Sequence, residues 1–257
     1  GDCSGSDQLI VSSSGTFQLD TNSTLYMGTS SSFSVNSGAT VRIIGTTQAN
    51  KPVVTRQCAG DYAFTINNGG TIHAIYALFE YMNGFGINVA AGSTVDLTNN
   101  FSYCTFQNGS SSGPRLRYEA SQALSGVNRV LLAQFLDSPG GSASNVYRAN
   151  GAAGNIEFKF AQGDISGEDY DNDVHDKIEW EAEVVWTGTI DTDWEELGNW
   201  ADGIAGEDFG PSEFVDVVIP DVSGSSGNFP VISATSLASL GQANRLEVQA
   251  DATLDVL

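Results

Sequence analysis

The sequence has few charged side chains and very little lysine. Only 16% of its 257 residues are charged and 40% are hydrophobic, which excludes both a charge-rich helical protein and a disordered tail. No apolar run approaches the roughly 18 residues of a membrane-spanning helix, and the nearest is 129–136. Lysine and glutamate, both good helix formers, are rare before residue 150. We therefore expect a folded, largely non-helical protein without a transmembrane segment.

Cysteine is also scarce, and its spacing fits no metal site. Cys3, Cys58 and Cys104 are an odd number, so at least one thiol stays unpaired within the chain. The sequence does not decide whether a disulfide forms, and Cys3 with Cys58 is the pairing that we favour. Phosphate-binding loops, zinc spacings and the Gly-x-Ser-x-Gly nucleophile motif are all missing from the sequence. The sequence therefore contains no motif that would assign the protein to a phosphate-binding, zinc-dependent or serine-nucleophile class of enzyme.

Basic residues are few, and the acidic excess lies almost entirely after residue 150. Residues 1–150 contain 8 acids and 7 bases, whereas residues 164–221 contain 19 acids and a single base, Lys177. Such a surface repels nucleic acid and anionic lipid, which excludes both as partners. It attracts divalent cations or a basic partner, although keeping the protein soluble would explain it equally well.

A short phrase recurs along the chain: small or polar residues, then threonine, then an aliphatic residue. Positions 16, 24, 32 and 40 are eight residues apart, which is one short strand plus one turn, so three units make a rung of about 24 residues. Polar and apolar residues alternate within units, as in strands. We predict an all-β parallel solenoid, with the right-handed β-helix as the expected form. The clearest copies contain Thr24, Thr40, Thr71, Thr94 and Thr253.

Phenylalanines repeat at a similar interval. Phe79, Phe106, Phe135 and Phe160 are separated by 27, 29 and 25 residues. A coil that returns every 23–29 residues would stack these rings at about 4.8 Å per turn. We interpret the four rings as a structural ladder in the core, and the corner asparagines, such as Asn67 and Asn100, as hydrogen-bonded ladders at bends.

The character of the sequence changes near residue 163. We predict a parallel β-helix over 1–163, an acidic connector over 164–185, and a tryptophan-bearing β repeat over 186–257 that leads into a further, truncated solenoid segment. The strand-like sequence 215–220 and the phrase at Thr253 support this second segment. Because the sequence ends inside such a phrase, we expect it to be a piece of a longer protein.

Several short motifs follow residue 185: Trp186-Thr187-Gly188, Asp191-Thr192-Asp193-Trp194, Asn199-Trp200 and Asp216-Val217-Val218-Ile219-Pro220. Together they resemble a repeat of large exported proteins of Bacteroidetes, and residues 163–180 are similar to the end of the β-helix regions in those proteins. Such proteins are commonly secreted or anchored at the cell surface, often through type IX secretion, and many are regarded as adhesins. Since the family has no agreed activity, the resemblance implies an extracellular location and an architecture.

The acidic segment is a candidate calcium site. Oxygen ligands for Ca²⁺ lie at about 2.3–2.6 Å, and carboxylates at alternate positions can gather around such an ion. The EF-hand pattern fails, because Val174 stands where that loop needs glycine. A solvated acidic turn is the interpretation that we prefer, with calcium as the alternative. The candidate ligands are Glu168, Asp169, Asp171, Asp173 and Asp176.

Two other kinds of site are weighed. Trp186, Trp194 and Trp200 could form a glycan-stacking platform, although a small β module often uses its tryptophans as its core. For catalysis, the acids before residue 160 are scattered and do not pair at one rung spacing. Arg115 and Arg117 share a face and could supply a lyase base. The two histidines, at positions 73 and 175, fit no triad.

We therefore predict a structural or adhesive segment of a large secreted or cell-surface protein, acting as a stiff extracellular stalk or filament and not as an enzyme. Its expected partners are other segments of the same polypeptide, neighbouring copies or surface glycans, and Ca²⁺ is the one cofactor considered. Two alternatives stay open: a polysaccharide lyase or hydrolase built on a β-helix, and a non-catalytic glycan-binding module.

Overall fold

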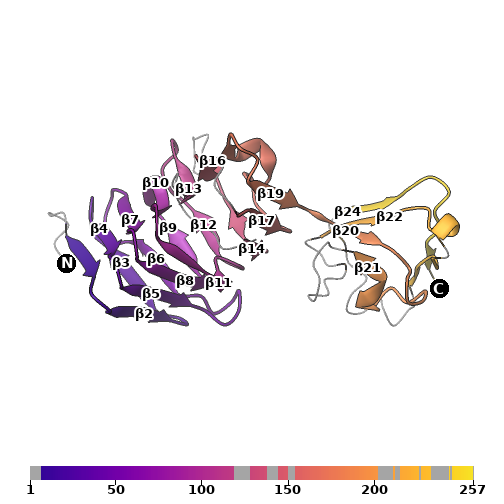
Figure 1. Cartoon of the computed structure of the whole chain (residues 1–257), viewed down its shortest axis with the longest axis horizontal. Helices are drawn as coiled ribbons and strands as arrows, with labels where there is room; N and C mark the ends of the chain where they lie inside the picture. Colours follow the sequence, from indigo (N-terminus) through magenta and orange to yellow (C-terminus); the bar gives the residue numbers. More distant parts are fainter. Residues whose placement is uncertain are drawn as a thin grey trace. The chain divides into compact units, whose positions relative to one another are not determined.

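The chain forms two compact units, Gly1–Glu181 and Ala182–Leu257, which are drawn from indigo to yellow along the sequence (Figure 1). The computed structural model describes residues 7–118, 128–137, 144–149, 154–201, 211, 215–225, 227–232, 243 and 245–256. Within these residues no helix has the length and apolar character needed to cross a membrane.

The first unit is a parallel β-solenoid of about seven turns, which confirms the predicted fold class. One sheet takes a strand from every turn, in the order β1-β4-β7-β10-β13-β16-β18. A second sheet contains β2-β5-β8-β11, a third β3-β6-β9-β12-β15, and a fourth β14-β17-β19 (Figure 1). The strands are β1 (Gln8–Val11), β2 (Thr16–Asp20), β3 (Thr24–Met27), β4 (Ser32–Val35), β5 (Thr40–Ile44), β6 (Val53–Arg56), β7 (Tyr62–Ile66), β8 (Thr71–Ile75), β9 (Leu78–Glu80), β10 (Met82–Val89), β11 (Thr94–Asn100), β12 (Thr105–Gln107), β13 (Pro114–Tyr118), β14 (Asn128–Leu131), β15 (Gln134–Phe135), β16 (Ser144–Arg148), β17 (Ile156–Lys159), β18 (Asn172–Asp173) and β19 (Ile178–Glu181), with one short 3₁₀ helix, η1 (Glu168–Tyr170).

The recurring phrase marks the same corner in successive turns. Thr16 lies opposite Thr40, Thr40 opposite Thr71, and Thr71 opposite Thr94, so the turns differ in length by several residues. A glycine with φ near +75° stands two residues before three of these threonines. A Cβ at the last of these glycines, Gly92, would lie 2.4 Å from the Asn68 side chain. Glycine is therefore required where one turn passes over the next.

Three of the four predicted ladder residues stack as expected. The rings of Phe79 and Phe106 are 5.5 Å apart between centroids, and those of Phe106 and Phe135 are 5.1 Å apart, both nearly parallel. Their strands are in register, with Phe79 opposite Phe106 and Phe106 opposite Phe135. All three side chains are buried in the core.

The fourth predicted member, Phe160, was wrongly placed. Gln134 pairs with Gln162, so the position next to Phe135 in the following turn is Gly163, which has no ring. The rings that pack on Phe135 are instead those of Phe158 at 5.4 Å and Trp180 at 5.8 Å.

Phe160 belongs to a different column, at the corner that follows β8, β11, β14 and β17. Tyr76, Tyr103, Leu132 and Phe160 all have positive φ, between 47° and 57°. The backbone N–H of each donates across to the next turn, to the carbonyls of Ser102, Leu131, Lys159 and Glu181. A left-handed conformation is costly for large side chains, so this corner is held by the hydrogen bonds between turns.

The solenoid also extends further along the chain than predicted. The sequence predicts an acidic connector over 164–185, but within it β18 pairs with β16 and β19 pairs with β17, both in parallel. Ile178 is buried, and Trp180 stacks on Phe158 at 4.5 Å. The acidic sequence therefore covers the outside of a last turn whose inward positions remain apolar.

The second unit is a smaller β module. Its main sheet has the order β21-β20-β22-β24, in which β20-β22-β24 are parallel and β21 is antiparallel, and β23 and β25 form a parallel pair. Parallel pairing of strands far apart in sequence thus recurs in this unit. Its elements are β20 (Glu183–Trp186), η2 (Leu197–Asn199), β21 (Trp200–Ala201), β22 (Asp216–Ile219), η3 (Ser223–Ser225), β23 (Val231–Ile232), β24 (Arg245–Val248) and β25 (Asp255–Val256).

Candidate functional site

The three tryptophans of the second unit form its core. Trp186, Trp194 and Trp200 are 0%, 2% and 8% exposed, and Trp200 packs edge-on against the other two at centroid distances of 4.9 and 4.8 Å. Their ring N–H groups are also used: Trp186 Nε1 donates to the Asn228 carbonyl at 2.6 Å and Trp200 Nε1 to the Trp194 carbonyl at 3.0 Å. This burial overturns the predicted glycan-stacking platform on these residues, because the three indoles pack on one another and none is more than 8% exposed. Trp186 also lines the pocket beside this core.

Asn199 organises the loop that encloses these indoles. Its side chain is fully buried. The Oδ1 atom accepts from the N–H groups of Ile190 at 2.8 Å and Asp191 at 3.1 Å, while Nδ2 donates to Asp191 Oδ1 at 2.8 Å and the Asp193 carbonyl at 3.0 Å. The polar residues of this motif therefore fold the loop over the tryptophans.

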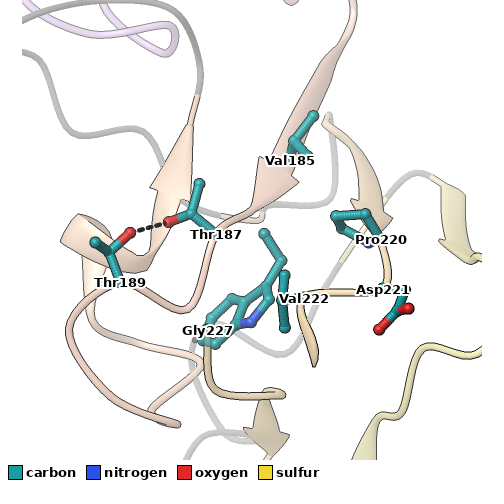
Figure 2. A pocket seen from close by; sticks show the side chains of 8 residues that line it. Val185, Thr187, Thr189, Pro220, Asp221, Val222 and Gly227 are labelled. Carbon is teal, nitrogen blue, oxygen red and sulfur yellow. Dashed lines mark hydrogen bonds between the residues drawn. The ribbon is translucent and has the colours of Figure 1, made fainter. Parts of the chain in front are cut away.

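A pocket of about 590 Å³ lies beside this core. Figure 2 shows Thr187 and Thr189 on one side and Asp221 on the other, with the Thr189 hydroxyl donating to that of Thr187 at 2.7 Å. The hydroxyl and N–H of Ser223 donate to Asp221 and lower the pKa of that carboxyl. Asp221 is the one titratable side chain among the residues described as lining the pocket. The described lining of the pocket thus contains a single carboxylate and not the pair that a glycoside hydrolase uses.

The predicted calcium segment uses two of its carboxylates internally. Asp173 accepts the backbone N–H groups of His175 at 3.1 Å and Ile178 at 2.7 Å, as well as that of Lys177. Asp171 accepts the Trp180 ring N–H at 2.8 Å. Both carboxylates thereby fix the last turn of the solenoid.

The same carboxylates repel one another. Burial raises the pKa of Glu168, and the charges of Asp171, Asp176, Asp173 and Asp169 raise it further. Burial likewise raises the pKa of Asp171, with Asp173 adding to the shift, while the bond from Trp180 opposes it. The crowded negative charges therefore lower the stability of this turn at neutral pH.

The carboxylates of residues 168–176 are also the predicted calcium ligands. Among the residues with described positions, no three His, Cys, Asp or Glu side chains are grouped to hold a metal ion. Calcium binding by residues 168–176 stays a prediction of the sequence. A chelator should lower the melting temperature of the wild-type chain and not that of Asp171→Ala. An unchanged wild-type melt would contradict it.

The cysteines and arginines also have defined positions. Cys58 is disulfide-bonded, and Cys104 is a free, buried thiol whose pKa is raised by burial to about 12. Cys3, the predicted partner of Cys58, lies outside the described residues.

The predicted lyase base is not accessible. Arg115 is fully buried and donates from Nε and Nη2 to the Leu136 carbonyl at 3.1 and 3.0 Å, so it cannot serve as an exposed base. Arg117 lies over the ring of Tyr147, 4.2 Å from its centroid.

One group of chemically active side chains was missed at the sequence level. Arg42 on β5 lies opposite His73 on β8, and His73 Nδ1 is 3.4 Å from Asp96 Oδ2 on β11. The three residues project outward from consecutive turns of one sheet: Arg42 and His73 lie between buried neighbours, and Asp96 follows the buried Val95. Each follows the threonine of the recurring phrase by two residues. The phrase itself was therefore the signal that could have revealed this row.

The row has a distinct electrostatic character. Burial lowers the pKa of His73, and the charge of Arg42 lowers it further, against the opposing pull of Asp96. Although burial opposes it, N–H groups of Asn99 and Thr98 and the nearby His73 hold the pKa of Asp96 below its usual range. The arrangement thus presents a guanidinium, an imidazole that favours its neutral form and an oriented carboxylate on an otherwise nearly neutral region.

Comparison with known proteins adds no relative: no family model, curated protein or solved structure matches the chain.

Proposed function

We propose that this chain is a structural and adhesive segment of a large exported surface protein, in which the solenoid serves as a stiff stalk. The observation that carries the proposal is the ladder of side-chain hydrogen bonds that joins one turn to the next. Asn67 Nδ2 donates to Asn36 Oδ1 at 2.8 Å, Thr105 Oγ1 to Gln134 Oε1 at 2.7 Å, and Gln134 Nε2 to Gln162 Oε1 at 3.0 Å.

These ladders make the turns equivalent units of length. Every turn adds about 4.8 Å to the stack and buries its apolar face on its two neighbours alone. Backbone bonds between strands and side-chain bonds between the same positions resist bending together. A segment of this kind holds other parts of a protein at a distance, which is the work of a stalk.

Two features support an exported location. The motifs after residue 185 resemble those of large exported proteins of Bacteroidetes, many of them type IX secretion substrates. Cys58 is disulfide-bonded, and disulfides persist mainly in oxidising compartments outside the cytosol. We therefore place the segment outside the cell, with its neighbours in the same polypeptide or in adjacent copies as its partners.

A deletion of one whole turn tests the stalk function. Removing residues 71–93 puts Thr94 in the place of Thr71, its partner in register, so the following strands continue on the same faces. We expect this variant to fold with an unchanged circular dichroism spectrum and to be displayed by the source cells as the wild-type chain is. Deleting residues 71–81, about half a turn, is the matched control and should unfold the solenoid, because it moves later strands to the wrong faces.

The enzyme alternative is tested with the same proteins. Both the wild-type chain and the whole-turn deletion are incubated with polysaccharides, and the chain lengths of the products are measured. A stalk leaves the polysaccharides at their original length. Shortened products that disappear in the whole-turn deletion would contradict the proposal, because they would place a catalytic site in the removed turn.

A further inference from the structure

The outward row on the sheet β2-β5-β8-β11 contains a cation, Arg42, whose side chain has no partner among the residues with described positions. Gln18, Arg42, His73 and Asp96 occupy equivalent positions in four consecutive turns. Within the described part of the chain, the Arg42 guanidinium makes no hydrogen bond or ion pair, although His73 and Asp96 follow it in the same row. Its donors are therefore available to a ligand.

Asp96 makes no ion pair with Arg42 among the described residues, because both of its oxygens face other groups. Its Oδ1 accepts the N–H groups of Thr98 at 3.1 Å and Asn99 at 2.6 Å, and the Asn99 side chain at 3.1 Å. These bonds shape a bulge, since the register between β8 and β11 shifts after Val95. The other oxygen, Oδ2, faces His73 Nδ1.

His73 is thereby oriented. Its Nδ1 is shielded from water and makes no hydrogen bond within the described residues, with Asp96 Oδ2 3.4 Å away, while its side chain remains 18% exposed. With Nδ1 turned toward Asp96, the other ring nitrogen, Nε2, is the one that can meet a ligand. The side chains that act on His73 are Arg42 from β5 and Asp96 from β11.

We propose that Arg42 and His73 bind an oxyanion of an acidic glycan, either the carboxylate of a uronic acid or a sulfate ester. The guanidinium of Arg42 supplies a planar, two-pronged donor for such a group. Thr40 and Thr71, also in register and outward-facing, stand two residues before Arg42 and His73 and offer hydroxyls to the sugar. The outer face of β5 and β8 is thus the binding surface.

The proposal also predicts a dependence on pH. At neutral pH the imidazole is uncharged and Nε2 accepts a hydroxyl, whereas below its pKa it becomes a second cation beside Arg42. Affinity for the oxyanion should therefore rise as the pH falls from 7 toward 5. The bound anion should in turn raise the pKa of His73, because it favours the charged form.

The test is calorimetric titration of the full chain with three probes: trigalacturonate, a sulfated galactose tetrasaccharide and an uncharged galactose tetrasaccharide. We expect one or both charged probes to bind and the uncharged one to bind at least tenfold more weakly. The two charged arms distinguish carboxylate from sulfate. Equal binding of all three probes, or binding of none, would overturn the proposal.

Two variants locate the site. Arg42→Gln should weaken the charged probe by about tenfold or more, since a charge-assisted contact is lost. His73→Gln should remove the rise in affinity at low pH while leaving binding at pH 7 within a few-fold of wild type. The control is Arg129→Gln, which removes an arginine already paired with Glu157 at 2.8 Å and should leave affinity unchanged. Equal effects of Arg42→Gln and Arg129→Gln would contradict the assignment.

This site stands apart from the stalk function. The deletion of residues 71–93 keeps the strand register, removes His73 and puts Asp96 in its place opposite Arg42, so it should abolish binding of the charged probe in a chain that still folds. A folded deletion variant that binds the probe normally would refute the site and leave the stalk in place. An unfolded deletion variant, with the Arg42→Gln result intact, would refute the stalk and leave the site.

Discussion

The solenoid and the second unit build their cores in different ways from similar strands. In the solenoid, each core ring takes its neighbours from the turns before and after it, as Phe106 does between Phe79 and Phe135. In the second unit, three indoles from different segments meet around one loop held by Asn199. The first core is therefore a column that can be lengthened, and the second is a closed cluster that cannot.

This difference predicts how each unit responds to damage. A column loses the contacts around one ring when that ring is removed, and the turns beyond those contacts keep their own packing. A cluster closed by a single loop loses its centre when one indole is removed. Variants in the two cores should therefore separate the two units in unfolding experiments.

The largest effect is expected in the second unit. Trp186→Ala removes a fully buried indole and its hydrogen bond to the Asn228 carbonyl, and it should destabilise this unit by about 4 kcal/mol or more. Urea unfolding followed by circular dichroism and tryptophan fluorescence should show the second unit unfolding early while the solenoid transition stays in place. A single transition that shifts as a whole would mean that the two cores are not independent.

A ring in the middle of the column is next. Phe106→Ala should cost the solenoid about 3 kcal/mol, measured as a lower urea midpoint, and the second unit should keep its own midpoint. Phe106→Leu, which preserves most of the volume, should cost less than about 1.5 kcal/mol. Similar losses for the two variants would show that stacking geometry, and not filled volume, holds the column.

The last turn of the solenoid allows a finer comparison within one segment. Asp173→Ala leaves three backbone N–H groups without their acceptor, at a cost of about 1 to 3 kcal/mol. Thermal melts in EDTA would measure it. If Asp173→Ala melts with the wild-type chain, the acidic segment does not fix this turn.

Asp171→Asn should change stability in the opposite direction to Asp173→Ala, and its effect should be the smallest of the series. Asp171→Asn keeps an oxygen for the Trp180 ring N–H and removes a charge from a repulsive group, so it should raise the melting temperature slightly at pH 7 in EDTA. Because the pKa values of Asp171 and Glu168 are raised in the folded state, the folded chain binds protons more readily than the unfolded chain. Their contribution favours folding at acid pH and is lost as the pH rises through the folded pKa values.

The advantage of Asp171→Asn should therefore shrink as the pH falls from 7 toward 4. The check is the difference in melting temperature between the variant and the wild-type chain across this range. A difference that does not change with pH would mean that charge repulsion is not its cause.

The fold was predictable because its repeat is local. The threonine phrase marks the same corner although successive turns span 24, 31 and 23 residues, and Phe79, Phe106 and Phe135 follow one another at 27 and 29 residues. Phe160 was misassigned because the matching position in its turn is Gly163, and a spacing cannot show which of two nearby positions carries the ring. The last turn was missed because its acidic outer residues conceal the inward Ile178 and Trp180.

The candidate sites were harder to predict for a related reason. Arg42, His73 and Asp96 are 31 and 23 residues apart in sequence, so the row becomes visible only when the register of β5, β8 and β11 is known. The tryptophans presented the reverse difficulty. Their spacing is equally consistent with an open platform and with a core, and burial alone decides between the two.

The central claim is that the chain is a stalk segment outside the cell, and labelling of intact source cells tests it most directly. An antibody raised against residues 7–118 is applied to intact and to lysed cells, and surface-bound label is measured together with its loss after external protease treatment. The account predicts full labelling of intact cells and loss of the label with protease. Labelling that requires lysis would contradict it.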